Sequence, residues 1–311
     1  MRALVTGGAG LVGSEIVDTL LVNGHEVVSL DNYIAGKHEN LTGALNNPRF
    51  TEIEGDICDT DLLDRLIGTG FDVIFHEAVS KNTVCLIDPN KDLEVNAGGT
   101  LNLLIAARKH GVSRFIHAST GSVYGPAKIY PTDEDHPKNP ASFYGVSKLA
   151  AETYVRLFNE FYGLPTVILR YFHVYGSRQD SSDFGGVIPL FIRKVLSGES
   201  IDVTGDGQQI RAFTHVSDVA RINMLASQND TSIGGIYNCA SDERVSILSL
   251  AQNIIAQVGN SESRINFIPD RIGDIRHFDV SNLKLKKELE FESFVSFEEG
   301  LARTIDELRR N

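Results

Sequence analysis

Cysteine is scarce in this chain of 311 residues, which contains only three. Cys58, Cys85 and Cys239 are far apart in the sequence and form no Cys-x-x-Cys pair. Zinc sites and disulfide frameworks need closely spaced or numerous cysteines, so we expect neither, and we expect no metal site. Because sparse, unpaired cysteines suit a reducing compartment, a cytoplasmic protein is predicted.

The chain also lacks an excess of basic residues and any long apolar run. Its 29 lysines and arginines are outnumbered by 41 aspartates and glutamates, for a net charge of -12. Such a surface repels nucleic acid and anionic membranes, and the densest basic run, Lys284 to Lys287, is followed at once by acidic residues. No apolar stretch has the roughly 20 residues of a membrane span, and Met1 leads into a strand-like run without a signal-type segment. We expect neither a nucleic-acid nor a membrane partner.

The first half of the sequence alternates short β-branched runs with longer amphipathic segments, which is the pattern of βαβ units. Parallel strands need crossover connections, and these are normally right-handed, so a doubly wound parallel sheet is predicted. This is an α/β architecture of the Rossmann type. The predicted strands are residues 2–6, 26–30, 50–54, 73–76, 114–118 and 166–170, and the predicted helices are 11–22, 93–110 and 144–162.

From about Gly176 the alternation loosens. Glycine and aspartate interrupt it at 205–207, and shorter helices are predicted at 246–258 and 297–310. We therefore divide the chain into residues 1–175 and a smaller mixed α/β part, residues 176–311, that supplies mainly substrate contacts around a shared cleft.

A glycine-rich turn follows the first predicted strand, with Gly7, Gly10 and Gly13 in Gly-x-x-Gly-x-x-Gly spacing. Glycine lets the backbone approach a pyrophosphate closely, and the helix N-terminus that follows offers free N–H groups to an anion. The second strand leads to Asp31, at the distance expected for a carboxylate that binds both ribose hydroxyls of an adenosine. Because a carboxylate repels a 2′-phosphate, NAD rather than NADP is the predicted cofactor of residues 1–175.

Tyr144 and Lys148 lie four residues apart on one face of a predicted helix. A phenol with a pKa of about 10 is a poor base at neutral pH, but a nearby lysine charge and a nicotinamide cation stabilise the phenolate. We therefore expect a lowered pKa for Tyr144, which makes it a candidate general base. Thr120 lies 24 positions earlier, after a predicted strand, where ligands bind in such sheets.

Along essentially its whole length the sequence resembles the extended short-chain dehydrogenase/reductase family, in its NDP-sugar epimerase and dehydratase branch. The matching segments besides the glycine turn and the Tyr-Lys pair are residues 56–57, 76–79, 95–100, 118–125, 170–176, 205–207 and 271–274. So many matches in the same order make coincidence implausible.

The resemblance implies two sets of site residues. The cofactor-binding set is Gly7, Gly10, Leu11, Val12, Gly13, Asp31, Asn32, Asp56, Ile57, Ala78, Val79, Asn96, Tyr144, Lys148 and Phe172. The substrate-binding set is Thr120, Tyr144, His173, Val187, Arg211, Arg271 and Phe278. Within these sets the resemblance makes Thr120, Tyr144 and Lys148 catalytic, and it makes Arg211 and Arg271 a diphosphate clamp, a role that suits the rigid arginine fork.

The reaction implied is NAD-dependent inversion at C4 of a UDP-hexose through a 4-keto sugar. A 4,6-dehydratase of this family places Asp and Glu directly after the threonine, and a UDP-glucuronate decarboxylase typically has Glu at the second position. This chain has Gly121 and Ser122, which cannot transfer those protons. A sugar reductase and a non-catalytic dinucleotide-binding protein are further alternatives.

Two departures from the family pattern bear on the substrate. His173 stands where hexose epimerases usually have asparagine, and a charged histidine would suit a carboxylate, which keeps UDP-glucuronate as an alternative. Phe278 aligns with a position where bulk crowds an N-acetyl group, which favours UDP-glucose and UDP-galactose over UDP-N-acetylglucosamine. The resemblance also suggests a homodimer formed through helices 93–110 and 144–162.

Overall fold

The computed structural model describes residues 1–80, 84–182, 185–259, 262–269 and 279–310. Within these residues the centre is a seven-stranded sheet in the order β11-β6-β5-β4-β1-β2-β3, with every neighbouring pair parallel. This confirms the predicted Rossmann-type α/β fold, and β2, β5 and β6 extend one or two residues beyond their predicted ends. The strands are β1 (Arg2–Thr6), β2 (Glu26–Asp31), β3 (Phe50–Glu54), β4 (Val73–His76), β5 (Arg114–Thr120), β6 (Thr166–Tyr171) and β11 (Ile236–Cys239).

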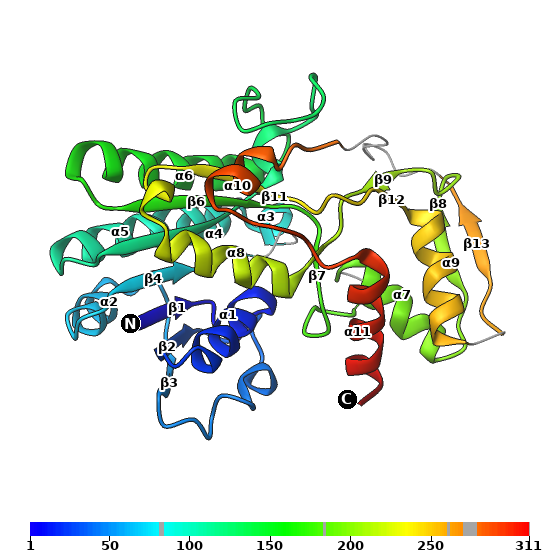
Figure 1. Cartoon of the computed structure of the whole chain (residues 1–311), viewed down its shortest axis with the longest axis horizontal. Coiled ribbons are helices and arrows are strands. Elements are labelled where there is room, and N and C mark those ends of the chain that lie inside the picture. The colour runs from blue at the N-terminus through cyan, green and yellow to red at the C-terminus, as the bar shows by residue number, and fades with distance from the viewer. Residues whose placement is uncertain (81–83, 183–184, 260–261, 270–278, 311) are drawn as a thin grey trace.

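Helices cover both faces of the sheet (Figure 1). On β1, Ala3 and Val5 pack into one apolar cluster and Leu4 into the other. All three are buried, as expected for a parallel strand enclosed on both sides. The helices of one face are α1 (Leu11–Val22) and α8 (Val216–Gln228), and those of the other are α2 (Thr60–Ile67), α5 (Thr100–Lys109) and α6 (Phe143–Tyr162).

The strand order reverses between β1 and β4. From β1 the chain builds the sheet outward through β2 and β3, and from β4 it builds in the opposite direction through β5 and β6. At such a switch point the connections after the two strands diverge, which leaves a crevice at the carboxyl ends of the strands. The glycine turn after β1 and the residues after β4 lie at this point.

The predicted helix 93–110 is in fact interrupted. The chain forms α3 (Val84–Ile87), α4 (Pro89–Leu93), a π-helical turn η2 (Glu94–Gly99) and then α5. A Cβ on Gly99 would lie 2.5 Å from Ile57 Cδ1, so this wide turn packs where only glycine fits. Single π turns are often found near functional sites, and the apolar periodicity of the sequence does not reveal them.

A smaller region of helices and short strands lies on the right of Figure 1. Its core contains Ile188, Ile192, Leu250 and Leu301. The pairs β8–β13 and β7–β10 are parallel, and β9–β12 is antiparallel. The elements are β7 (Val174–Tyr175), α7 (Val187–Leu196), β8 (Ile201–Thr204), β9 (Ile210–Arg211), β10 (Thr214–His215), β12 (Val245–Ser246), α9 (Ile247–Val258), β13 (Ile265–Ile268) and α11 (Phe297–Arg310).

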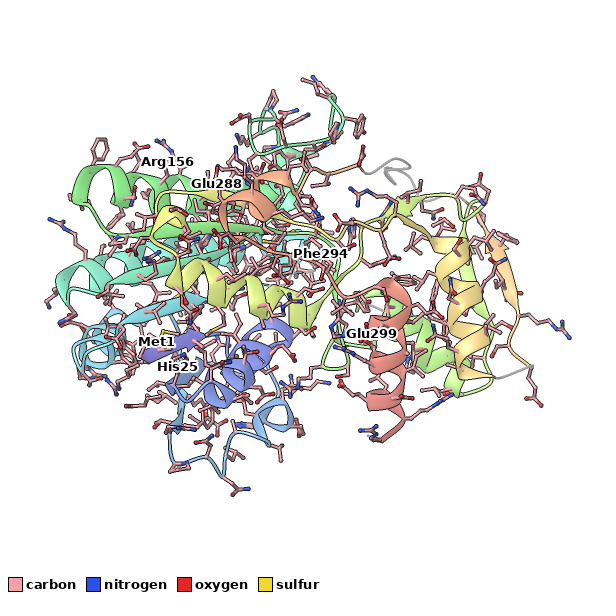
Figure 2. The ribbon with its side chains drawn as sticks, in the orientation of Figure 1. Met1, His25, Arg156, Glu288, Phe294 and Glu299 are labelled. Carbon is pink, nitrogen blue, oxygen red and sulfur yellow. The ribbon has the colours of Figure 1, made fainter. Side chains whose placement is uncertain are left out.

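The chain after residue 176 also returns to the main sheet. α8 packs against α1, and β11 pairs with β6 at the sheet edge. The short helix α10 (Leu283–Glu288) lies beside β11, where Glu288 accepts a hydrogen bond from the Tyr237 hydroxyl at 2.8 Å (Figure 2). The second part of the sequence is thus shared between the smaller region and the sheet. The remaining short helices are η1 (His38–Leu41), η3 (Gly121–Tyr124) and η4 (Asp230–Ser232).

Candidate active site

The glycine turn after β1 is shaped by close backbone contacts. Gly7 has φ +68°, and a Cβ there would lie 2.6 Å from the Ala78 nitrogen. A Cβ on Gly13 would lie 2.1 Å from the Gly7 oxygen, so α1 begins against the turn. Gly10, the N-cap of α1, offers no side chain to the first N–H groups of the helix. These groups are available to an anion at the helix N-terminus.

Asp31 ends β2 beside this turn. Its two carboxylate oxygens accept hydrogen bonds from the backbone N–H groups of Ala9 and Tyr33, both at 2.9 Å. A Cβ on Gly36 would lie 2.8 Å from both of these oxygens, so the loop after β2 closes tightly over the carboxylate. Asp31 and Asn32 line a cavity of about 250 Å³. A fixed carboxylate with spare lone pairs on a cavity wall suits a ribose diol.

The same cavity is also lined by Asp56, Ile57, Ala78 and Val79, which the resemblance implied as cofactor contacts. Asp56 accepts hydrogen bonds from the Asn32 side chain at 3.0 Å and from the Cys58 amide at 2.8 Å. Burial raises the pKa of Asp56, but these hydrogen bonds outweigh it and the net pKa is lowered. Asp56 therefore stays an acceptor at neutral pH, next to the flat apolar surface of Ile57.

Asn96 does not line either cofactor cavity. It is buried, its Oδ1 accepts from the Ser80 amide at 2.9 Å, and its Nδ2 donates to Asp92 and Ser147 at 3.0 Å each. The structure therefore places Asn96 behind the cavity, where it ties the segment after β4 to α4 and α6. The implied contact between Asn96 and the cofactor stays a prediction.

A second cavity of about 510 Å³ continues from the glycine turn toward α6, and Leu11 and Val12 line it. Two cations that the sequence analysis missed, Lys37 and Arg178, also line it, as does Asn40. Arg178 Nη2 lies 2.5 Å from Asp18 Oδ2 on α1, which fixes the guanidinium beside the helix N-terminus. Two positive charges and the open end of α1 suit a pyrophosphate. The described residues therefore fit a dinucleotide along the whole crevice.

The predicted catalytic pair lines the same cavity. Ser142 caps the N-terminus of α6, accepting from the Gly145 N–H at 3.0 Å, and the first turns of the helix bring Tyr144 and Lys148 to one wall. Thr120, at the end of β5, forms a side-chain hydrogen bond with Tyr144. The three residues predicted to be catalytic are therefore brought together by β5 and α6.

The protein itself does not lower the pKa of Tyr144. Burial raises it to about 12, and the hydrogen bond from Thr120 opposes that rise only in part. The lowered pKa expected for Tyr144 from Lys148 and a nicotinamide cation together concerns the cavity with its cofactor bound, and it stays a prediction. Burial also lowers the pKa of Lys148 to about 8, against the opposing charges of Glu77, Glu152 and Asp92. A phenolate at Tyr144 needs a further positive charge in the cavity.

A buried ion pair supports the catalytic elements from beneath. Arg170 on β6 donates to both carboxylate oxygens of Glu152 on α6, at 2.9 and 2.7 Å. Ser119, next to Thr120, donates to Glu152 at 2.5 Å, and Arg170 also donates to the Tyr124 hydroxyl at 2.6 Å. These bonds join β5, β6, α6 and η3, and thereby fix the strand end that carries Thr120 relative to Tyr144.

A third cavity of about 370 Å³ begins at Thr120, and Tyr171 belongs to its wall as well as to that of the 510 Å³ cavity. The two cavities therefore share Tyr171 as a wall residue, with Thr120 in one and Tyr144 and Lys148 in the other. The described residues that line the third cavity are Thr120, Gly121, Ser122, Gly125, Pro126, Ala141, Ser142, Tyr171, Phe172 and His173, without a carboxylate among them. Phe172, implied as a cofactor contact, lines this third cavity instead.

Gly121 has no room for a side chain. A Cβ there would lie 2.2 Å from Cε1 of Phe172, far inside contact distance. The Phe172 ring is 2% exposed and packs among Val123, Tyr124 and Ala212, so it cannot swing away freely. An aspartate in place of Gly121 would not fit this arrangement.

His173 lines the third cavity, but as a neutral imidazole. Burial lowers its pKa to about 3, and the charge of Arg211 contributes in the same direction. Its ring meets that of Phe213 edge-on, with centroids 6.0 Å apart. At neutral pH His173 therefore adds no positive charge to the cavity of the protein alone, and its predicted role as a donor to a sugar substituent, including a carboxylate, stays a prediction.

The other predicted substrate-binding residues lie in different places relative to the three cavities. Arg211 on β9 lies near enough to His173 to lower its pKa, although it lines none of the three cavities. Val187 begins α7, immediately after Gly185 and Gly186, which line the 510 Å³ cavity, and packs on the core of the smaller region. Arg271 and Phe278 lie outside the described residues.

Within the described ranges, no group of three or more His, Cys, Asp or Glu side chains could hold a metal ion. A search of the same residues for a helix long and apolar enough to cross a membrane finds none.

Comparison with known proteins gives the chain relatives along its full length. Residues 3–240 match the model of the NAD dependent epimerase/dehydratase family. The chain is 37% identical to the UDP-glucose 4-epimerase of Mycolicibacterium smegmatis over 311 residues, or 99% of each chain. It is 33% identical to a dTDP-glucose 4,6-dehydratase of Actinoplanes (100% of this chain, 98% of that protein) and 35% identical to UDP-glucuronic acid decarboxylase 1 of Danio rerio (99% and 73%).

Solved structures that resemble the chain include 4-epimerases of two different sugars. A UDP-glucose 4-epimerase from Thermotoga maritima, determined with UDP-glucose, aligns with a TM-score of 0.93 at 35% identity, covering 100% of this chain and 99% of that one. A UDP-glucuronic acid 4-epimerase from Bacillus cereus, determined with UDP-glucuronic acid and NAD, aligns at 0.91 and 31%, covering 100% and 99%.

Proposed function

Because the chain belongs to the NAD-dependent epimerase/dehydratase family, we propose that it inverts the configuration at C4 of a UDP-hexose, with UDP-glucose and UDP-galactose as its substrates. NAD is its cofactor, as in the family and in related structures. Held along the crevice by the glycine turn and Asp31, NAD would supply the acceptor for a hydride from the sugar carbon and would return that hydride, so it would not be consumed.

The contact between Gly121 and Phe172 carries this proposal. A 4,6-dehydratase needs an acid and a base beside the sugar in addition to the phenol, and the resemblance places them directly after the threonine. Here the first position is Gly121, where a side chain would collide with Phe172, and the second is Ser122, whose hydroxyl is too weak an acid and base to transfer these protons at neutral pH. Epimerisation at C4 needs only the phenol among the protein's proton-transfer groups.

The neutral state of His173 favours an uncharged sugar. With a pKa of about 3, the imidazole supplies no positive charge to a hexuronate at neutral pH. It still offers one N–H donor and one acceptor, which suit hydroxyl groups. This supports UDP-glucose and UDP-galactose over UDP-glucuronate. UDP-N-acetylglucosamine stays an alternative, because the expectation against it depends on Phe278, which lies outside the described residues.

In the proposed mechanism, Tyr144 removes the proton of the C4 hydroxyl as the hydride leaves C4, and the product is a 4-keto sugar. Thr120, which lines the substrate cavity, hydrogen-bonds the sugar O4. Lys148, as an ammonium ion, stabilises the phenolate. The keto sugar then turns within the cavity while Arg211 and Arg271 hold the diphosphate, and Tyr144 returns the proton after hydride attacks the opposite face.

A panel of nucleotide sugars tests the proposal. Purified protein is incubated, without added cofactor, with UDP-glucose, UDP-N-acetylglucosamine, UDP-glucuronate and dTDP-glucose, and the products are resolved by NMR. We expect UDP-galactose from UDP-glucose as the fastest conversion. A 4-keto-6-deoxy product, a pentose product from UDP-glucuronate, or faster inversion of another sugar would contradict the proposal.

We also propose that the protein is a homodimer that associates through α5 and α6. Val146, Tyr154 and Phe161 recur at helical spacing along α6 and are 52%, 40% and 73% exposed, and Ile105 on α5 is 53% exposed. A stripe of exposed apolar side chains that recur on one face of a helix favours burial against a partner. A second copy is the expected partner because the same stripe on two molecules is self-complementary about a two-fold axis.

Sedimentation velocity of Phe161→Glu tests the dimer. We expect the variant to sediment as a monomer while wild type sediments as a dimer. Leu283→Glu is the matched control, because Leu283 on α10 is 71% exposed but lies away from the stripe. The proposal would be contradicted if wild type sedimented as a monomer or if Phe161→Glu still sedimented as a dimer.

None of the three cysteines forms a disulfide, although all lie in the described part of the chain. We propose on this ground that the protein works in the reducing cytosol.

A further inference from the structure

Glu77 is a carboxylic acid on the wall of the catalytic cavity that the proposed mechanism does not use. It follows β4 directly, and its backbone N–H donates to the Thr6 oxygen at 3.0 Å, which fixes its position across β1. It lines both the 510 Å³ cavity and the 250 Å³ cavity, where the two meet. It therefore stands in the path of a dinucleotide that extends from Asp31 to Tyr144.

The side chain of Glu77 points toward the catalytic end of this path. Its Oε1 accepts a hydrogen bond from the Tyr171 hydroxyl at 2.9 Å, and Tyr171 also lines the substrate cavity. Lys148 interacts with it electrostatically, since each group shifts the pKa of the other. The carboxyl group thus lies between the end of β6 and the catalytic lysine.

The hydrogen bonds around Glu77 favour its ionised state and so oppose the burial that raises its pKa. Asn223 on α8 donates from Nδ2 to the Tyr171 hydroxyl at 2.7 Å and to the Val219 oxygen at 2.9 Å. Because the phenol oxygen accepts from Asn223, its own proton is directed at Glu77. The chain of donors from Asn223 through Tyr171 therefore ends on an acceptor, and the carboxylate is the stronger acceptor.

A carboxylate in this place has a specific consequence for a nicotinamide. The oxidised ring carries one positive charge and the reduced ring carries none. Lys148 at the same wall repels the oxidised form, whereas a carboxylate beside it attracts that form and offsets the lysine. Burial raises the pKa of Glu77 to about 7, opposed by the Tyr171 hydrogen bond and Lys148, so its charge is sensitive to a further cation in the cavity.

We propose that Glu77 is a positioning residue that places a negative charge at the reactive end of the cavity, and that this charge makes the protein prefer oxidised over reduced dinucleotide. An enzyme that accepts and returns one hydride within each turnover must begin every cycle with the oxidised form. The inference rests on the same site as the proposed function, but it does not depend on which sugar is bound.

The test is a binding competition without any sugar. Holoprotein is equilibrated with a large excess of NAD⁺ and NADH in a fixed ratio and rapidly desalted, and the bound forms are quantified by chromatography after denaturation. Replacing Glu77 by glutamine keeps the size and removes the charge. We expect the bound NADH to NAD⁺ ratio to rise about tenfold in Glu77→Gln, the effect of one screened charge several ångströms away.

Three further variants make the result specific. Glu77→Asp keeps the charge and is expected to stay closer to wild type than Glu77→Gln. Tyr171→Phe removes only the donor and should shift the ratio in the same direction by less, which tests the inference even if Glu77→Gln does not fold. Glu54→Gln removes an exposed carboxylate at the end of β3, outside the cavities, and should leave the ratio unchanged.

A ratio within about twofold of wild type in both Glu77→Gln and Tyr171→Phe would overturn the proposal, and so would an equal shift in Glu54→Gln. Because no sugar is present, these outcomes do not depend on the substrate. A wild-type protein that shows the expected ratio but inverts no UDP-hexose would refute the proposed function and leave this inference standing.

Discussion

Replacing Gly121 by alanine tests the packing on which the choice between epimerase and dehydratase depends. The new methyl carbon would start 2.2 Å from Cε1, 2.6 Å from Cδ1 and 2.8 Å from Cζ of Phe172. Ordinary contact begins near 3.4 Å, so the ring edge must retreat by more than 1 Å. Phe172 is buried, so the retreat must be taken up by its neighbours.

The cost of such overpacking is about 1–3 kcal/mol of folding free energy. Phe172 also lines the substrate cavity beside Thr120, so its displacement should move the sugar relative to Tyr144. A misplacement of about 1 Å near a reacting centre costs on the order of 100-fold in rate. We therefore expect Gly121→Ala to lose stability in urea titrations and to lower kcat/KM for UDP-glucose by about 10- to 100-fold.

Gly43→Ala is the matched control, because nothing lies within 4 Å of a Cβ at that position. A double variant that adds Phe172→Leu should recover part of the lost stability, since the smaller side chain makes room. The reasoning is refuted if Gly121→Ala is as stable and as active as Gly43→Ala. Phe172 could then move aside without loss of stability, and an aspartate at position 121 would also fit.

Tyr144→Phe should abolish interconversion of UDP-glucose and UDP-galactose while bound NAD is retained, as measured by NMR and by cofactor content; retained turnover would remove Tyr144 from the role of base. Glu152→Gln should destabilise the protein by about 3–5 kcal/mol in urea titrations, because it leaves the buried Arg170 uncompensated; a loss below about 1 kcal/mol would contradict a structural role for the pair. Glu77 has a pKa raised to about 7, so its contribution to stability is fully present below its unfolded pKa of 4.5 and is lost as pH rises through 7. Between pH 5 and 8, wild type should therefore lose about 2 kcal/mol of stability relative to Glu77→Gln in parallel urea titrations. This value is reduced because Glu77 is partly exposed to the cavity. A stability difference between the two proteins that does not change with pH would contradict the raised pKa.

The sequence predicts the sheet well because its strands are continuous apolar runs bounded by turns. β1 to β4 lie within a residue of their predicted ends, and the glycine turn, Asp31, Tyr144 and Lys148 all line the crevice. Local signals suffice here, since each strand, cap and glycine is specified by residues close to it in the chain.

Features that depend on distant contacts could not be predicted. Asn96 carries an amide that suits a ligand, and only its contacts with Ser80, Asp92 and Ser147 show that it is used within the protein. The neutral state of His173 follows from burial, which the sequence does not report. Lys37 closely follows Asp31 and Arg178 closely follows the 170–176 segment, so both could have been suspected as phosphate contacts. Only the folded structure shows that the two side chains line the same cavity.

The edge strand β11 has a consequence for any attempt to work with half of the molecule. It is contributed by residues 236–239, and it pairs with β6 along the outer edge of that strand from Ile168 to Tyr171. A fragment that stops at residue 175 would keep every element of the dinucleotide crevice up to β7, yet it would expose an apolar strand with unpaired backbone groups. Such a fragment is expected to aggregate through that strand, so truncation experiments on this enzyme must retain residues 214–240 or supply them as a second chain.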